Sequence, residues 1–409
     1  MLARVIVMYR YAVLPAVQVL LLGLLIACVA APARASDDAT SAAPAHASDV
    51  AAGAVTARTP ASGGGEDIVT LETGGSQGIT VRLAEDLAGI VDDGATRRIV
   101  PVVGHGGVDN IADLLQTPGI DTAILQLDVL NYARVHKLFP DLAGEVSYIA
   151  KLNYVEFNLL AGPGVNTIAD LDGKRVSVGR QLGNTAITAE QLFQLLHLSV
   201  VMTNDPPDLA LDKLSHGDVS AIAFVGGKPV PFLRMAPSTG LHLVSVPLSP
   251  EVAAVYIPTR LTATDYPGLI SAEAPVSTIA IPTGLFVGPV TEGSDSYRKI
   301  SNIVDAFFTQ FQTLLAPGHH PKWTEVSLAA EIPGWHRFPA ADDWLKRNAA
   351  VVAGQDLRAI FMRFLDERQK AVGGSAMSQA QKDALFDQFR QWQMTQTPGP
   401  QPVPASQTH

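Results

Sequence analysis

The stretch "GKRVSVGRQLGNTAI", residues 173–187, predicts a strand, a tight turn and the first turn of a helix. Val176 and Val178 flank Ser177 in a short strand pattern that Gly179 ends. Asn184 and Thr185 are residue types that cap helices, and apolar residues then recur at helical spacing. A glycine-flanked turn between strand and helix leaves backbone N–H groups free, so the stretch predicts an anion-binding turn in an α/β protein.

Length, composition and charge limit the size of the protein's domains and the class of ligand that such a turn can bind. The chain has 409 residues, 47% hydrophobic and 17% charged, which is enough for two domains with sizeable cores. Its formal net charge is −10, which argues against nucleic acid as a partner. We therefore expect local geometry, and not overall charge, to hold any anionic ligand.

The first 35 residues resemble an export signal. Arg4 and Arg10 precede an apolar run over residues 11–31, and Ala33-Arg34-Ala35 follows as a small-x-small cleavage pattern. A membrane span is the alternative, because the run is nearly long enough. The polar, small-residue segment that follows favours a signal peptide.

Cys28 is the only cysteine, so no intramolecular disulfide can form. Residues 25–28 resemble a bacterial lipobox, in which the cysteine is lipidated. Lipidation at Cys28 and cleavage after Ala35 are both open, and both place the mature protein outside the cytoplasm. Contact with a membrane is expected only through a lipid anchor or a permease.

Composition also divides the rest of the chain. Residues 36–65 are rich in Ala, Ser, Pro and Gly and predict a disordered tether. From Asp67 to about Phe311, short apolar runs alternate with amphipathic helical patterns, which predicts α/β architecture with largely parallel sheets. We expect residues 331–397 to form a helical extension, with helices over 355–370 and from a Ser378–Gln381 capping box, and 398–409 to form a disordered tail.

Most motifs of common enzymes are missing. The sequence holds no Walker loop, H-E-x-x-H or C-x-x-C pattern. The G-x-S-x-G spacing of a nucleophile elbow does occur at residues 74–78, in the first glycine-rich turn, but no spacing of Ser, His and Asp residues selects a catalytic triad. His319 and His320 are adjacent on a loop, which is a poor geometry for one metal ion. We therefore expect no catalytic residue, cofactor or metal.

Five stretches instead place a turn after a predicted strand and carry Gly, Thr, Ser or Gln, at residues 72–80, 102–110, 123–129, 173–187 and 223–229. Ligands of open α/β sheets bind beyond the carboxyl ends of the strands, where these turns lie. The predicted ligand-binding residues are Thr73, Gly75, Ser76, Gln77, His105, Gly106, Gln126, Asp128, Arg180, Asn184, Thr185, Gly226 and Gly227.

Two of these residues have a second interpretation. Arg180 could fork onto a ligand carboxylate with two hydrogen bonds, or point to solvent or a surface carboxylate. His105 could contact the ligand or be a solvated turn residue. Asp128 suits an amine or hydroxyl better than a carboxylate.

In this order, the turns resemble the TAXI family, the TRAP-associated extracytoplasmic immunogenic proteins, which are solute-binding subunits of one branch of TRAP transporters. The resemblance covers about residues 67–311. It rests on T-G-G-x-x-G at 73–78, G-G-V-D-N-I at 106–111, A-x-x-Q-x-D at 123–128, D-L-x-G-K-R-V-S-V-G at 170–179, G-x-P at 227–229 and Y-P-G at 266–268.

The chain departs from the family pattern at two turns. Thr80 stands where an aromatic residue is usual. Residues 182–185 stand where the family usually has a G-S-G-T turn, and in this chain the same turn also contains Arg180 and Gln181. The ligand therefore stays open relative to the glutamate-like or dicarboxylate solutes that the family suggests.

The resemblance implies a type II periplasmic-binding-protein fold, with two α/β lobes around a ligand cleft. The first lobe would comprise residues 66–153 and 275–330, and the second 154–274, with crossovers around Phe157–Leu160 and Ile279–Leu285. The implied function is capture of a small organic anion, an amino acid or a carboxylate, for a TRAP membrane subunit. A transporter-independent sensor or scavenger, possible with the same fold, and an extracytoplasmic enzyme are the alternatives.

Overall fold

The computed structural model describes residues 67–76, 78–236, 240–350, 358, 361–362, 365 and 377–396. The chain divides into two units, Met1–Thr59 and Pro60–His409, and every described residue lies in the second. The predicted signal peptide, Cys28, the tether, Gln77, most of the 355–370 helix and the tail at 398–409 lie outside the described residues.

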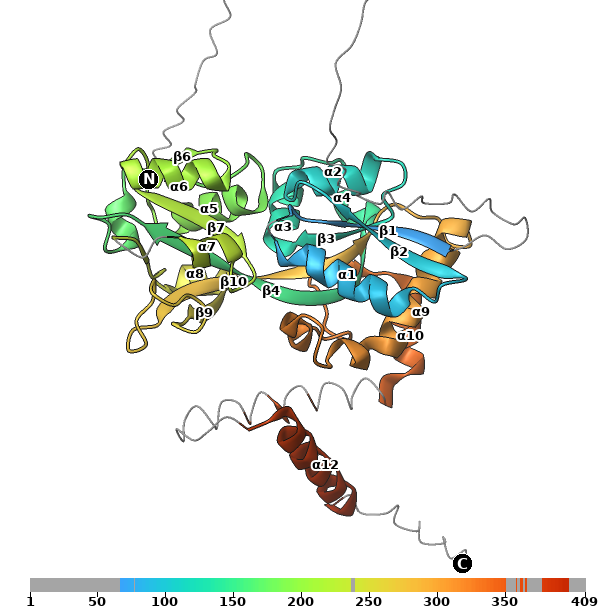
Figure 1. Cartoon of the computed structure of the whole chain (residues 1–409). Helices are drawn as coiled ribbons and strands as arrows, with labels where there is room; N and C mark the ends of the chain where they lie inside the picture. Colours follow the sequence, from blue (N-terminus) through green and yellow to red (C-terminus); the bar gives the residue numbers. More distant parts are fainter. Residues whose placement is uncertain are drawn as a thin grey trace, which may run out of the picture. The chain divides into compact units, whose positions relative to one another are not determined.

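One lobe is formed by the first part of the chain, and the chain returns to it after β10 (Figure 1). Strands β1, β2 and β3 are parallel to one another and alternate with helices. The elements of this lobe are β1 (Asp67–Thr73), α1 (Ile79–Val91), β2 (Arg97–Val103), α2 (Val108–Gln116), β3 (Thr122–Gln126), α3 (Leu127–Val135), α4 (Leu142–Glu145), α9 (Asp295–Leu314), η2 (Pro321–Glu325), β11 (His336–Arg337) and α10 (Pro339–Arg347).

The other lobe is built from the middle of the chain. Its strands β5, β6 and β7 are also parallel and are also followed by helices. Its elements are η1 (Ile168–Leu171), β5 (Arg175–Ser177), α5 (Asn184–Leu195), β6 (Val201–Thr203), α6 (Pro207–His216), β7 (Ala221–Gly226), α7 (Pro231–Met235), β8 (His242–Leu243), α8 (Pro250–Val255) and β9 (Ile257–Leu261).

Two long strands, β4 (Ser147–Ala161) and β10 (Val276–Val287), run from one lobe into the other (Figure 1). They pair with each other, and each also pairs with a neighbour in each lobe: β10 with β3 and β9, and β4 with β11 and β7. The strand order is β2-β1-β3-β10-β4-β7-β5-β6. Counted from the outer edge of the sheet toward the connecting strands, the order is β2-β1-β3 in one lobe and β6-β5-β7 in the other. In each lobe, the strand that comes first in the sequence therefore lies between the other two.

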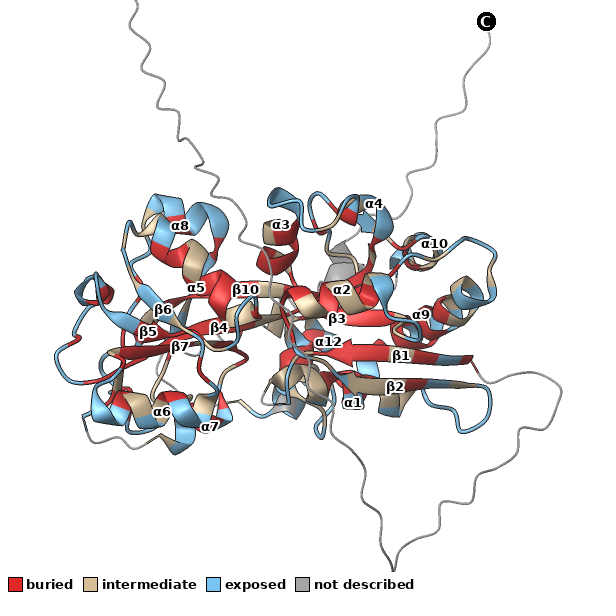
Figure 2. Cartoon of the chain, turned by 90° about the horizontal axis from the view of Figure 1, so that it is seen from above, coloured by how far each residue is buried: buried red, intermediate tan, exposed pale blue. Residues whose placement is uncertain are grey.

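Hydrophobic clusters cover both faces of the sheet in each lobe, so that the strands are the most buried part of the molecule (Figure 2). In the first lobe α1 and α9 cover one face and α2 and α3 the other. In the second lobe α5 and α8 cover one face and α6 and α7 the other. Parallel strands covered on both faces are the expected result of apolar strands that alternate with amphipathic helices.

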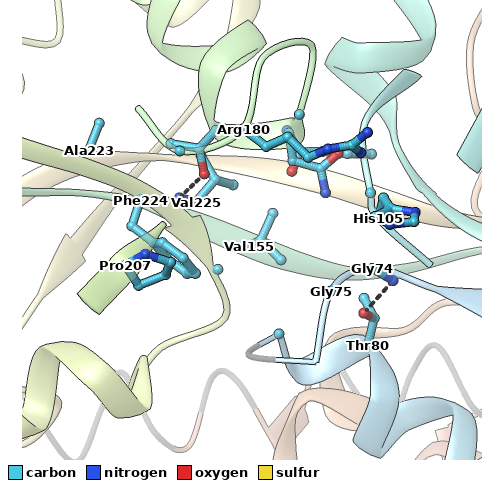
Figure 3. Close-up of a pocket in the computed structure, with 18 of the residues that line it drawn as sticks. Gly74, Gly75, Thr80, His105, Val155, Arg180, Pro207, Ala223, Phe224 and Val225 are labelled. Atoms are coloured by element: carbon cyan, nitrogen blue, oxygen red, sulfur yellow. Dashed lines mark hydrogen bonds between the residues drawn. The ribbon is translucent and has the colours of Figure 1, made fainter. Parts of the chain in front are cut away.

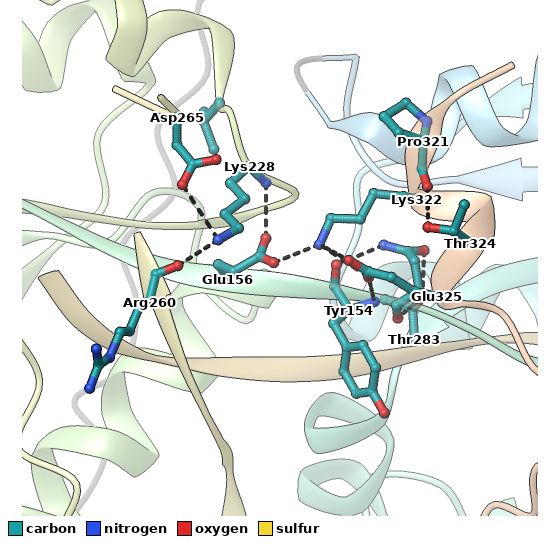
Figure 4. A network of polar contacts seen from close by, with 12 residues as sticks. Tyr154, Glu156, Lys228, Arg260, Asp265, Thr283, Pro321, Lys322, Thr324 and Glu325 are labelled. Atoms are coloured by element: carbon teal, nitrogen blue, oxygen red, sulfur yellow. Dashed lines mark hydrogen bonds and ion pairs between the residues drawn. The ribbon is translucent and has the colours of Figure 1, made fainter. Parts of the chain in front are cut away.

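A buried polar network occupies the crossing of the lobes (Figure 4). Lys322 Nζ lies 2.6 Å from Glu156 Oε1 and 2.8 Å from Glu325 Oε1, and Glu156 Oε2 accepts a 2.9 Å hydrogen bond from the Lys228 N–H. Glu156 pairs in register with both Ala280 of β10 and Gly226 of β7. The network therefore joins η2 of the first lobe to the connecting strand β4 and to the loop after β7.

The predicted two-lobe α/β fold with two connecting strands is confirmed, and each predicted strand overlaps an observed one. Sequence patterns located only part of β4, which begins ten residues before the predicted Phe157. The Ser378–Gln381 capping box is confirmed by reciprocal bonds of 2.8 and 3.3 Å at the start of α12 (Gln379–Gln396).

Candidate functional site

A cavity of about 560 Å³ opens between the lobes, at the carboxyl ends of their parallel strands. Figure 3 shows Gly74, Gly75 and Thr80 on one side, Phe224 and Pro207 on the opposite side, and Val155 of β4 between them. The volume falls within the range of roughly 300–1,000 Å³ that is typical of small-molecule sites.

Three helices begin at this cavity, and none has a side-chain cap. The residues before their first turns are Gly78 for α1, Gly183 for α5 and Pro206 for α6, and all three line the cavity. At the cavity, α1 and α5 leave N–H groups without an intrahelical partner, whereas α6 begins with Pro206 and Pro207, which have no N–H. The dipoles of all three helices add partial positive charge there. Because α1 belongs to one lobe and α5 and α6 to the other, both lobes present positive potential to the cavity.

Ser177 is the polar side chain that best indicates a ligand here. It ends β5, is 0% exposed and lines the cavity, but its Oγ has no hydrogen-bond partner among the described residues. The hydroxyl has the Asp205 carboxylate as an acidic neighbour and helps to lower the pKa of that carboxylate. A buried hydroxyl without a well-aligned partner is unfavourable, so rotation of the side chain would let it donate to an acceptor in the cavity.

The charged side chains at the cavity are already paired. The Arg180 guanidinium pairs with Asp109 of the other lobe, and Asp205 accepts from Lys213 and Thr203. Burial opposes ionisation of Asp205, but the hydrogen bonds from Lys213 and Thr203 outweigh it, so its pKa is lowered and it stays charged. Within the described lining, no basic side chain lacks an acidic partner apart from His105.

Close contacts hold the lobes together on both sides of the cavity. The Gly107 N–H donates to Asn184 Oδ1 at 2.8 Å, and the Val108 N–H donates to the Leu182 carbonyl at 3.0 Å. On the other side, Gly227 lies against Ile79 of α1 so closely that a Cβ at 227 would overlap the isoleucine side chain. The structure therefore has the lobes closed around the cavity.

The structure brings ten of the predicted site residues to the cavity. They are Gly75, Ser76, His105, Gly106, Gln126, Arg180, Asn184, Thr185, Gly226 and Gly227. Thr73 is fully buried, with its hydroxyl bonded to backbone carbonyls, and does not line the cavity; Gln77 lies outside the described residues.

Asp128 and Arg180 have partners within the protein that the sequence did not predict. Asp128 is buried away from the cavity, where it accepts from Gln126, Thr188 and Tyr256 and ties α3 to the other lobe. Burial raises the pKa of Asp128 although these hydrogen bonds oppose it. The Arg180 guanidinium pairs with Asp109, which is the second of its two interpretations, and direct binding of a ligand by Arg180 stays a prediction.

Asn184 and Thr185 begin α5 but do not cap it. Asn184 accepts from Gly107, and Thr185 Oγ1 accepts a 3.0 Å hydrogen bond from the Val225 N–H (Figure 3). Both side chains therefore fix neighbouring backbone, which is an effect of tertiary structure that helix-capping preferences do not contain.

Sequence reasoning missed Asn110 and Ser177. Asn110 Oδ1 accepts from the N–H groups of His105 and Gly106, and its Nδ2 donates to the Thr73 carbonyl, so it shapes the turn after β2. The signal for Ser177 was a polar residue between two valines at the end of a buried strand. No local signal separated Phe224 and Phe232, which line the cavity, from ordinary core residues.

The NMT1-like family model matches residues 71–330. The chain therefore belongs to the NMT1-like family, and the match includes both lobes and every cavity residue. No curated protein matches the chain.

Among solved structures, a TctC solute binding protein from Polaromonas is 16% identical, with 74% of this chain and 98% of that chain covered and a TM-score of 0.39. The periplasmic binding protein BugD is 14% identical, with 71% and 97% covered and a TM-score of 0.41. The GluR0 ligand-binding core from Nostoc punctiforme in complex with (L)-glutamate is 13% identical, with 60% and 93% covered and a TM-score of 0.35.

None of the helices in the described part of the chain is both long and apolar enough to cross a membrane.

Proposed function

We propose that the protein is an extracytoplasmic solute receptor that binds one small organic anion between its lobes. The observation that carries the proposal is the meeting of the uncapped N-termini of α1 and α5, one from each lobe, around a cavity that is also lined by Ser177. Free N–H groups and a hydroxyl are donors that suit a carboxylate.

We expect binding and not turnover. Ser76, the serine of the G-x-S-x-G spacing, lies in the turn between β1 and α1 and lines the cavity, as do Ser177 and His105. Among the described residues, no hydrogen bond joins either serine to His105. The receptor is expected to be exported, with Cys28 lipidated or with cleavage after Ala35. Cys28→Ala should release it from the membrane fraction only if Cys28 is the anchor.

The TAXI-like order of turns supports delivery of the solute to a TRAP-type membrane subunit. A sensor or scavenger without a transporter is the second candidate, since the same cavity would serve it. A permease gene beside the receptor gene, together with loss of transport of the identified solute when the receptor is deleted, would favour the transport role over the sensor.

Native mass spectrometry of protein purified from the extracytoplasmic fraction tests the receptor itself. We expect one small anion per chain, which is released on denaturation. Ala223→Trp, which adds bulk inside the cavity, should abolish the adduct, whereas Ala169→Trp on the exposed side of η1 should retain it. Hydrolytic turnover that disappears in Ser177→Ala would instead show an enzyme.

A further inference from the structure

The cavity has an apolar end in addition to its polar one. Ala210 and Ile222 are 1% and 3% exposed and belong to the hydrophobic cluster of the second lobe under α6 and α7, yet both line the cavity. Phe224 and Phe232 line it as well, as an edge-to-face pair with ring centroids 4.8 Å apart. The cavity therefore extends from the polar mouth into the core of lobe 2.

The charges at the cavity limit what a ligand can carry. A second carboxylate would need another cation, but Arg180 is paired with Asp109, which leaves only the imidazole of His105 in the described lining. An ammonium group would need a free carboxylate, but Asp205 already holds Lys213 and Thr203. Burying a charge without a partner is strongly unfavourable, so dicarboxylates and α-amino acids fit this lining poorly.

From these observations we infer that the ligand is a monocarboxylate with an apolar, ring-sized body. The carboxylate lies at the N-termini of α1 and α5 beside the Ser177 hydroxyl, and the apolar body lies against Phe224 and Phe232. This inference rests on the proposed receptor function and narrows its ligand class. A ring that packs on the edge or face of Phe224 gains contact area and a favourable aromatic geometry.

Titration calorimetry on the exported protein tests the inference with matched ligands. The apolar monocarboxylates are 3-phenylpropionate, indole-3-acetate and octanoate; the comparators are propionate, 3-phenylpropionamide, L-phenylalanine, succinate and L-glutamate. We expect at least one apolar monocarboxylate to bind, and 3-phenylpropionate to bind about 10- to 150-fold more tightly than propionate, because burial of the ring is favourable. The amide should bind at least about tenfold more weakly than the acid.

Two variants assign the two ends of the ligand. Phe224→Ala should weaken binding of 3-phenylpropionate about tenfold and leave the weak binding of propionate unchanged, whereas Phe224→Leu should recover part of the loss. Ser177→Ala should weaken both acids by the same factor, and its melting temperature, measured in parallel, shows how much stability the contact of the hydroxyl with Asp205 contributes. Circular dichroism before each titration shows whether the variant is folded.

Tighter binding of succinate, L-glutamate or L-phenylalanine than of all three apolar monocarboxylates would overturn the inference and leave the receptor intact. Equal effects of Phe224→Ala on 3-phenylpropionate and propionate would also overturn it. Failure of every acid to bind, together with no retained molecule in native mass spectrometry, would instead contradict the receptor function.

Discussion

The Gly107 N–H of one lobe donates a 2.8 Å hydrogen bond to Asn184 Oδ1 of the other. Gly107 has φ +71°, and a Cβ there would overlap the Leu182 carbonyl and lie 2.6 Å from Gly183 Cα. Only glycine permits this approach of the two lobes. The contact lies at the start of α5, beside the cavity, so it couples closure of the lobes to the proposed carboxylate site.

Gly107→Ala should therefore separate the lobes and weaken binding of the retained anion at least about tenfold, a loss of about 1.4 kcal/mol. Gly94→Ala is the matched control, because Gly94 has φ +72° but open space at the Cβ position. Gly94→Ala should lose about 1–2 kcal/mol of stability through strain, Gly107→Ala should lose more because its Cβ also meets the Leu182 carbonyl, and only Gly107→Ala should lose affinity. Equal affinities in the two variants, measured by calorimetry, would show that the Gly107 contact is not coupled to binding.

Arg180 and Asp109 should affect binding only through closure. Their side chains are 50% and 39% exposed, and exposed ion pairs contribute about 0–1 kcal/mol. Arg180→Ala and Asp109→Ala should each weaken binding by no more than about fivefold, and the double variant should be no weaker than either single one. If Arg180→Ala reduced affinity a hundredfold while Asp109→Ala had no effect, Arg180 would bind the ligand directly.

The architecture could be predicted because it depends on local patterns. Strand runs, helical spacing and glycine turns place β1, α1 and β7 from a few neighbouring residues each. The carboxyl-end turns then follow from parallel pairing, which is why most predicted site residues line the cavity.

The partners within the site could not be predicted, because they join residues far apart in sequence. Arg180 meets Asp109 and Asp128 meets Tyr256 only after the two lobes come together. Ala210 belongs to a core cluster and a cavity at once, and an apolar residue has the same sequence signal in both.

Glu72 should make stability fall as pH rises. It is 2% exposed, and burial first, then the negative charges of Asp113 and Asp109, raise its pKa to about 8. The folded state thus holds a proton that the unfolded state releases near pH 4.5, so its contribution is complete below that pH and is lost by about pH 8. The free energy of unfolding should fall by up to about 1.4 kcal/mol per pH unit across this window.

Glu72→Gln keeps a neutral side chain of similar size and should flatten this part of the pH profile, measured by urea unfolding at pH 5, 6, 7 and 8. Glu85→Gln, on the exposed side of α1, should keep the wild-type slope. The same slope in wild type and Glu72→Gln would rule out Glu72 as the source.

Lys322 should be essential for the stability of the lobe crossing. The side chains of Lys322 and Glu156 are only 6% and 3% exposed, and Lys322→Met would leave the carboxylate buried without its partner. Unfolding in urea should show a loss of about 3–5 kcal/mol, part of which Glu156→Gln should restore in the double variant.

Lys346→Met is the control for this effect, because Lys346 is 69% exposed and pairs with Asp342 on the surface of α10. It should change stability by less than about 1 kcal/mol. A loss in Lys322→Met as small as that of the control would mean that the buried pair contributes no more than a surface pair.

The central claim is that the cavity between the lobes binds an organic anion, and a crystal structure of the exported protein with its retained molecule tests it most directly. We predict electron density for one molecule, with an anionic oxygen within about 2.7–3.2 Å of Ser177 Oγ and of N–H groups at the start of α5 or α1. Density for the molecule outside the cavity, or an acidic group remote from both Ser177 and the helix N-termini, would contradict the account.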